Sequence, residues 1–133
     1  MALKKNTEGT LRITGGTQDG LGVGRADDMV VFTPGCACGD VARVQIVAVR
    51  ARYAYGRLLA VEQPSPARVP VDCPVFSRCG GCVSRHIRYE EELRLKEERV
   101  REALRRIARL EIVPEPIVGC EQTLAYRNKA QYP

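Results

Sequence analysis

The sequence contains no tryptophan, and aromatic residues make up only 5% of its 133 residues. The core is therefore expected to consist mainly of valine, isoleucine, leucine and alanine. No apolar run approaches the roughly 18 residues of a membrane-spanning helix, and no apolar stretch of a secretory signal follows the first residues. These absences argue against a membrane or secreted protein. We expect a cytoplasmic protein, where thiols stay reduced.

The length and charge of the chain set broad limits on its architecture and partners. A chain of 133 residues predicts one or two small domains. Small domains bury a limited share of their surface, so a metal or a partner would help to stabilise them. The 21 basic and 16 acidic residues leave a net charge of +5, a mild excess that permits a polyanionic partner without establishing one.

Three of the six cysteines fall within one short stretch. Cys73, Cys79 and Cys82 lie within ten residues, and the last two flank Gly80 and Gly81. A Cys-x-x-Cys loop lets both sulfurs reach one metal, and the glycines permit the tight backbone that this requires. Three thiolates suit zinc or an iron–sulfur cluster. The alternatives are a disulfide with one remaining thiol, or three thiols without a role.

The remaining metal-ligating residue types fit other roles better. His86 is a weaker candidate ligand, because a lone histidine is more often a packing or capping residue. Cys36, Cys38 and Cys120 lie outside the compact stretch. We expect these three thiols to be bystanders.

The first half of the chain has the pattern of a small β-barrel. Short apolar runs interrupted by glycine and aspartate predict strands at residues 11–14, 20–25, 29–32, 41–49 and 53–61. In the strongest run, Ala42, Val44, Ile46 and Ala48 share one face. Five short strands without an intervening helix predict a closed antiparallel barrel of the OB type.

The glycine-rich run at residues 20–25 invites comparison with a phosphate-binding loop. No long helix pattern follows it, and Asp27 and Asp28 come directly afterwards, where two carboxylates would repel a pyrophosphate. A glycine-kinked strand and hairpin is the better prediction.

The second half is predicted to be a separate, less regular unit. Pro64 and Pro66 form a stiff linker, so we place a boundary near residues 64–70 and divide the chain into residues 1–66 and 67–133. A long helix is expected at residues 89–110. Its apolar stripe comprises Leu93, Lys96 through its alkyl stem, Val100, Leu104 and Ile107. Residues 126–132 alternate as a strand without a partner, which suggests a truncated chain that can pair with a second copy.

Basic and aromatic residues on the predicted strands are candidates for binding RNA. Cationic groups neutralise phosphates, and tyrosines stack on unpaired bases. The alternative is an ordinary solvated surface. The candidates are Arg25, Arg50, Arg52, Tyr53, Tyr55 and Arg57 in the barrel, and Arg127 and Lys129 in the last predicted strand.

Several of these runs resemble known families. The stretches Asp-Gly-Leu-Gly-Val-Gly-Arg at 19–25, Val-Phe-Thr-Pro-Gly at 31–35 and Gly-Asp-Val at 39–41 resemble a TRAM domain. The stretch from Cys73-Pro74 to Cys79-Gly-Gly-Cys82, followed by Tyr-Arg-Asn-Lys at 126–129, is similar to the RNA (uracil-5-)-methyltransferases. Within that family, the resemblance is to the branch that acts on 23S ribosomal RNA.

This resemblance implies a fold, an activity and cofactors. The fold would be mainly β with one long helix: a TRAM barrel, a cysteine metal loop, the helix and a β segment. The activity would be transfer of a methyl group from S-adenosylmethionine to C5 of a uridine in 23S ribosomal RNA. A 4Fe–4S cluster would be held by Cys73, Cys79 and Cys82.

The chain departs from the family pattern at two points. The fourth cluster ligand would lie outside the chain, as would the catalytic domain, so the fragment is not expected to catalyse alone. Cys38 stands where relatives often carry proline. The alternative is a stand-alone RNA-binding module with a zinc-stapled loop and no catalytic activity.

Overall fold

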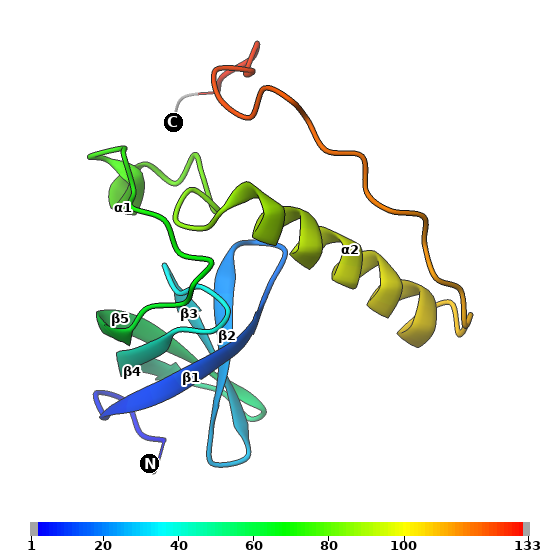
Figure 1. Cartoon of the computed structure of the whole chain (residues 1–133). Helices are drawn as coiled ribbons and strands as arrows, with labels where there is room; N and C mark the ends of the chain where they lie inside the picture. Colours follow the sequence, from blue (N-terminus) through cyan, green and yellow to red (C-terminus); the bar gives the residue numbers. More distant parts are fainter. Residues whose placement is uncertain (1–2, 132–133) are drawn as a thin grey trace.

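The computed structural model describes residues 3–131, and its N-terminal half is a closed five-stranded barrel (Figure 1). Around the barrel the strands follow the order β1-β2-β3-β5-β4. Every pair is antiparallel except β3 with β5, which run parallel. The predicted OB-like barrel is confirmed, with one parallel pair at its closure. The strands are β1 (Glu8–Gly16), β2 (Leu21–Ala26), β3 (Met29–Pro34), β4 (Val41–Val49) and β5 (Tyr53–Gln63).

The barrel core consists of small aliphatic side chains, as the shortage of aromatic residues predicts. On β4, Ala42, Val44 and Ile46 are completely buried, and they come from the face that the alternation predicts. Burying such side chains stabilises the fold by roughly 1.5–3 kcal/mol for each valine or isoleucine. The buried cluster comprises Leu11, Ile13, Ala26, Val31, Cys36, Ala42, Val44, Ile46 and Ala54.

The glycine-rich run forms a strand and hairpin, as predicted. Gly22 lies on β2 where the loop containing Cys36 approaches closely. A Cβ atom at Gly22 would lie 2.6 Å from the Cβ of Cys36, a distance too short for any side chain. The glycine is therefore needed for close packing between the strand and the loop.

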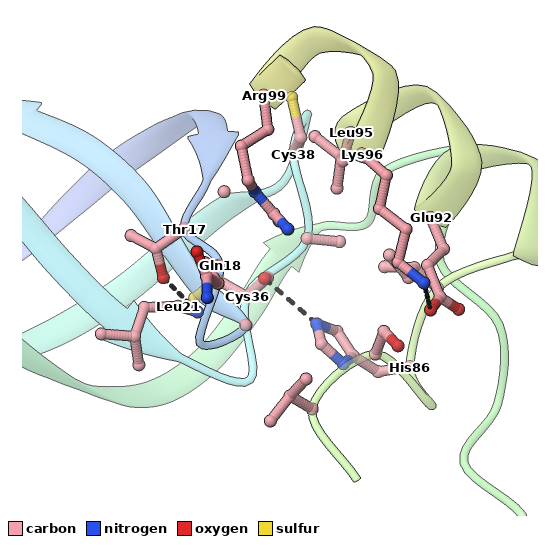
Figure 2. Close-up of a pocket in the computed structure, with 16 residues that line it drawn as sticks. Thr17, Gln18, Leu21, Cys36, Cys38, His86, Glu92, Leu95, Lys96 and Arg99 are labelled. Atoms are coloured by element: carbon pink, nitrogen blue, oxygen red, sulfur yellow. Dashed lines mark hydrogen bonds and ion pairs between the residues drawn. The ribbon is translucent and has the colours of Figure 1, made fainter. Parts of the chain in front are cut away.

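A short helix, α1 (Phe76–Cys79), and a long one, α2 (Tyr89–Arg106), follow the barrel (Figure 1). The long helix ends at Arg106, whereas residue 110 was predicted. Its first half lies against the barrel, where Leu95 reaches Gly16 and Lys96 of the predicted stripe lines the space between helix and barrel (Figure 2). Val100 is 50% exposed and Ile107 84% exposed, because the second half of α2 projects away from the barrel.

The remaining described chain, residues 107–131, contains no helix or strand. This C-terminal segment turns back along α2 (Figure 1). The Glu97 carboxylate accepts a hydrogen bond from the backbone N–H of Ile117 at 2.6 Å, and the Tyr89 hydroxyl accepts one from Cys120 at 2.7 Å. The strand predicted at 126–132 is therefore wrong as far as residue 131, and residue 132 lies outside the described range. Self-association of the chain through this segment stays a prediction.

Neither helix of the described residues is long and apolar enough to cross a membrane.

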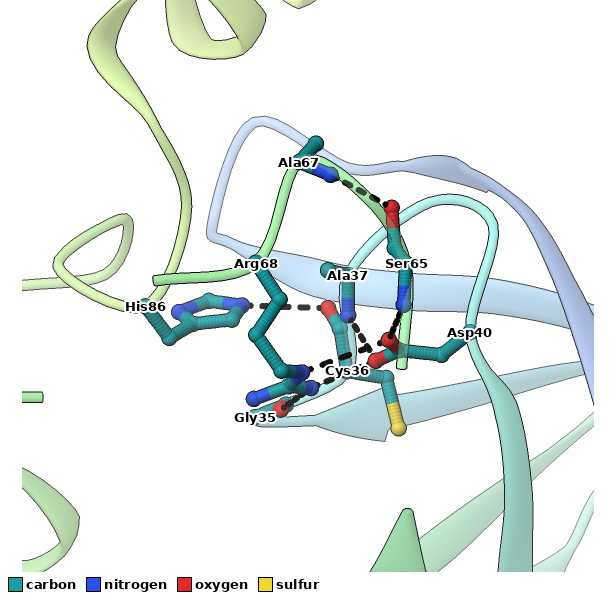
Figure 3. A network of polar contacts seen from close by, with 8 residues as sticks. All are labelled: Gly35, Cys36, Ala37, Asp40, Ser65, Ala67, Arg68 and His86. Carbon is teal, nitrogen blue, oxygen red and sulfur yellow. Dashed lines mark hydrogen bonds and ion pairs between the residues drawn. The ribbon is translucent and has the colours of Figure 1, made fainter. Parts of the chain in front are cut away.

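A buried carboxylate joins the barrel to the chain that follows it (Figure 3). Asp40, whose side chain is fully buried, accepts hydrogen bonds from the backbone N–H groups of Ala37 at 2.7 Å and Ser65 at 2.8 Å. The guanidinium of Arg68 donates to both oxygens of the same carboxylate and to the carbonyl of Gly35. Ser65, before the predicted boundary between residues 66 and 67, and Arg68, after it, are therefore both attached to Asp40 of the barrel loop. The division into two units remains a prediction.

This network also determines the charge state of Asp40. Burial is the largest effect and opposes ionisation of the carboxyl. The hydrogen bonds from Arg68, Ala37 and Ser65 together outweigh it, so the pKa of Asp40 is lowered from its ordinary value. Asp40 therefore carries a negative charge at neutral pH, matched by the positive charge of Arg68.

Replacing Asp40 is expected to destabilise the fold. Asp40→Asn leaves the partly buried Arg68 without its counter-charge, and we expect a loss of about 3 kcal/mol in the free energy of unfolding at pH 7. A lowered folded-state pKa stabilises the fold above the unfolded pKa of about 3.9, and this stabilisation is lost as the pH falls through the folded pKa. The difference between wild type and variant should therefore shrink below about pH 4.

Urea denaturation at several pH values measures both effects. Asp19→Asn, which makes the same charge change at an exposed position, is the matched control and should be nearly neutral. An Asp40→Asn variant within about 0.5 kcal/mol of wild type at pH 7 would contradict the role of the network.

Candidate nucleic-acid interface and cysteine loop

Three aromatic rings gather on the outer face of the barrel, where β3 runs parallel to β5. The rings of Phe32, Tyr53 and Tyr55 contact one another, with centroids 5.6–5.9 Å apart. Both tyrosines are 37% exposed. The faces and edges left open to solvent are suitable for stacking by flat ligands. We call these three residues the aromatic face.

Phe32 was not predicted as a site residue, although the pattern contains the signal for it. Val31 and Thr33 are buried, so Phe32 between them must point outward. Strand pairing places it opposite Tyr55. The alternation of residues 29–34 predicts that Phe32 points outward. Its position beside Tyr55 could be predicted only if the pairing of β3 with β5 were known.

Four of the candidate arginines lie on the strands and the turn next to the aromatic face. Arg25 pairs with Val30, which in turn pairs with Tyr53, so Arg25 lies two strands from that ring. Arg57 continues β5 beyond Tyr55 on the same outer side and donates a hydrogen bond of 2.6 Å to the side chain of Gln45. The exposed Arg50 and Arg52 lie in or next to the turn that leads into Tyr53.

The two predicted cations near the end of the chain do not lie on a strand. Arg127 donates a hydrogen bond of 3.1 Å to the carbonyl of Gly81, between the two closely spaced cysteines. Lys129 is exposed in irregular chain. Arg127 thus contacts the cysteine stretch directly, a contact that its position in the sequence does not reveal.

The cysteines lie on an excursion of the chain, residues 72–85, that we call the cysteine loop. Its base is closed by hydrogen bonds from Val69 N–H to the His86 carbonyl at 3.0 Å and from Arg88 N–H to the Ala67 carbonyl at 2.8 Å. Asp72 and Arg85 then form a two-bond ion pair at 2.7 and 3.0 Å. The loop therefore leaves the body of the protein and returns to it at adjacent points.

Within the loop, local geometry follows the glycine prediction. Helix α1 ends at Cys79, and Gly80 adopts a left-handed conformation with φ of 70°, which glycine adopts without steric cost. This turn redirects the chain toward Cys82. All three cysteines carry free thiols; Cys79 and Cys82 are exposed and Cys73 is partly buried.

The donor chemistry of the loop fits a soft metal or an iron–sulfur cluster, but the side chains do not converge. Among residues 3–131, no group of three or more histidine, cysteine, aspartate or glutamate side chains is arranged to hold a metal ion. Cys73, Cys79 and Cys82 are accessible thiols on a loop with a closed base. Metal binding would require the loop to draw them together.

His86 and Cys36 lie in the packing between the loop base and the barrel. His86 is 3% exposed and its Nε2 donates to the Cys36 carbonyl at 3.1 Å, while its ring packs on Phe76 at 5.7 Å. Burial lowers the pKa of His86. Burial, with a smaller contribution from the charge of Asp40, raises the pKa of Cys36 to about 11, so this thiol stays protonated and unreactive at neutral pH.

Comparison with known proteins agrees with the barrel geometry. Residues 3–59 match the sequence model of the TRAM domain. The TRAM-like barrel inferred from the glycine-rich hairpin and the Gly-Asp-Val run is thereby supported by an independent comparison.

Longer matches connect the whole chain with larger proteins. The chain is 37% identical over 131 residues to an uncharacterized RNA methyltransferase of Clostridium tetani, a match that covers 98% of this chain and 28% of that protein. It is 42% identical over 123 residues to an uncharacterized RNA methyltransferase of Porphyromonas gingivalis, covering 92% of this chain and 26% of that protein. The chain thus spans little more than a quarter of these curated relatives.

One solved structure is also similar. The solution structure of a conserved protein of Methanococcus maripaludis matches with a TM-score of 0.42 and 28% identity, over 44% of this chain and 83% of that one.

The buried His86 predicts a pH dependence of stability. It is the only histidine, and its folded-state pKa lies below the unfolded value of about 6.5. The unfolded chain therefore takes up a proton first as the pH falls, so the free energy of unfolding should decrease below about pH 6.5. Denaturation of wild type and His86→Gln at pH 7.5 and 5.5 measures this. An equal decrease in the variant would contradict the assignment to His86.

Proposed function

We propose that this chain is the RNA-recognition part of an S-adenosylmethionine-dependent RNA methyltransferase. The observation that carries the proposal is 37% identity over 98% of the chain to a protein named as an RNA methyltransferase. The TRAM match at residues 3–59 supports RNA as the partner. The position of the aromatic face beside several arginines supplies a physical basis for RNA binding.

The aromatic face would bind bases and the arginines would bind phosphates. Stacking needs a ring with an open surface, and Tyr53 and Tyr55 each keep more than a third of their surface exposed. Arg25 on β2 and Arg57 on β5 are both exposed on the outside of the barrel. A base that is already unpaired can stack there without the cost of opening a duplex.

The finer assignment is 5-methyluridine formation in 23S ribosomal RNA, in the cytoplasm. It is supported by the resemblance of the Cys-Gly-Gly-Cys and Tyr-Arg-Asn-Lys runs to that family. In such a reaction a cysteine attacks C6 of a flipped-out uracil and an acidic residue removes the proton from C5. These groups and the methyl-donor site would have to come from sequence that the 133 residues do not contain. No residue described above is therefore assigned a catalytic role.

The activity is tested with the gene's complete protein, 23S ribosomal RNA transcripts and S-adenosylmethionine. Nucleoside mass spectrometry should detect 5-methyluridine. Methylation of another base would refute the uracil assignment while leaving the methyltransferase proposal intact. The absence of any methylation would refute the methyltransferase proposal itself.

We also propose that the cysteine loop contributes Cys73, Cys79 and Cys82 to a 4Fe–4S cluster, with a fourth ligand from outside this chain. The support is the number and type of free thiols and the Gly80 turn between two of them. A cluster there would hold the loop in a single conformation. A zinc ion on the same thiols is the second candidate, and it fits a stand-alone RNA-binding module that lacks catalytic activity.

Removing the rings of the aromatic face should weaken RNA binding. For Tyr53→Ala with Tyr55→Ala we expect at least a tenfold loss of affinity for a single-stranded RNA, since stacking contributes about 1–3 kcal/mol per base. Tyr53→Phe with Tyr55→Phe keeps the rings and should bind within about twofold of wild type. Fluorescence anisotropy at several salt concentrations provides the measurement. Equal binding by both double variants would exclude stacking on this face.

Metal content distinguishes the two cofactor candidates. Because the cysteine loop supplies only three of the four proposed cluster ligands, the chain purified without oxygen should contain much less than one four-iron cluster, whereas the complete protein should contain close to one. Iron, acid-labile sulfide and zinc are measured per chain, with Cys79→Ser as the control that reduces the bound metal. A fully loaded cluster on the 133 residues alone would contradict the need for an outside ligand, and stoichiometric zinc in both proteins would support the module.

A further inference from the structure

A cavity of about 80 Å³ lies between the barrel and α2 (Figure 2), and no residue of the aromatic face lines it. The β1–β2 turn, the loop of residues 36–38, the end of the cysteine loop and one side of α2 enclose it. Its walls are mainly apolar, and a few polar groups reach it. An apolar hollow with a few convergent polar groups is typical of a small-ligand site. The apolar walls include Leu21, Ala37, Val83, Ile87 and Leu95.

Arg99 brings an uncompensated positive charge to this cavity. Its guanidinium extends from α2 into the space between helix and barrel, toward Gln18 (Figure 2). Lys96 lines the same cavity, but it forms an ion pair of 2.8 Å with Glu92. Within residues 3–131, Arg99 has no acidic partner. A partly buried guanidinium without a counter-charge favours a phosphate or carboxylate of a ligand.

His86 lines the cavity, and one nitrogen of its buried ring is an acceptor without a partner among the described residues. Its Nε2 faces the carbonyl of Cys36, which can only accept, so Nε2 carries the hydrogen and Nδ1 is an acceptor. Nδ1 is buried and has no hydrogen-bond partner in the described part of the chain. A buried acceptor without a donor is costly, and an N–H group of a ligand would satisfy it.

We propose that this cavity binds the edge of one unpaired RNA base, with the adjacent phosphate on Arg99. The hollow is too small for a whole nucleoside, so ribose and phosphate would remain at its mouth, where Arg99 reaches them. The N–H edge of the base would face Nδ1 of His86. This inference rests on the proposed RNA-binding function. It adds that the RNA places an unpaired nucleotide at the cavity between the barrel and α2.

Protection of Cys38 tests the location directly. Cys38 lines the cavity and is partly buried, whereas Cys120 lies exposed on the C-terminal segment. The wild-type chain is alkylated with iodoacetamide with and without a nine-nucleotide single-stranded oligouridine, and the rate at each cysteine is read by peptide mass spectrometry. We expect a several-fold slower reaction at Cys38 with the RNA and an unchanged rate at Cys120. A matched RNA duplex should protect Cys38 much less.

A charge reversal gives a second test. Arg99→Glu should weaken oligouridine binding about tenfold, because it places an acid where the phosphate binds. Arg101→Glu makes the same change at an exposed position of α2, and it should cost no more than about twofold through the general loss of positive charge.

The outcomes separate this inference from the proposed function. If the wild-type chain binds no RNA, both fail. If it binds oligouridine but Cys38 reacts at the same rate, or if Arg99→Glu loses no more affinity than Arg101→Glu, the nucleotide site in the cavity is refuted while RNA binding by the barrel stands.

Discussion

The buried ion pair between Asp40 and Arg68 is the contact on which the arrangement of the chain depends. Asp40 lies in the barrel loop, and its carboxylate accepts hydrogen bonds from Ala37, Ser65 and Arg68. Isolated charges are costly to bury, so this carboxylate needs every one of those donors. Because two of the donors belong to the chain after β5, the pair fixes where that chain leaves the barrel. The positions of the cysteine loop and of α2 follow from that point.

Two different surfaces result from this arrangement. The aromatic face lies on the outside of the barrel, where no other element of the described chain covers the rings of Tyr53 and Tyr55 completely. The cavity under α2 lies between elements and contains the charge of Arg99. In our proposals the first surface stacks bases and the second accepts one base edge. A single RNA strand contacting both surfaces would be bound at two places on a small protein, which raises affinity without a large interface.

The local pattern predicted the barrel well, because burial on one face imposes a period of two on each strand. Ala42, Val44 and Ile46 show this directly. Long-range contacts were not predictable in the same way. The Asp40–Arg68 pair joins residues that are 28 positions apart, and nothing local to either residue identifies the other. The strand predicted at the end of the chain failed because alternation alone does not supply a neighbouring strand to pair with.

The closed base of the cysteine loop bears on two processes that are often linked in small metalloproteins, namely folding and metal binding. In many such domains the metal is required for folding, because the ligands come from the elements that form the core. Here the buried core of the barrel contains no residue of the loop, and the ion pair of Asp72 with Arg85 lies at the base of the loop. The cofactor that we propose would therefore be inserted after the polypeptide has folded, with the barrel as a preformed platform.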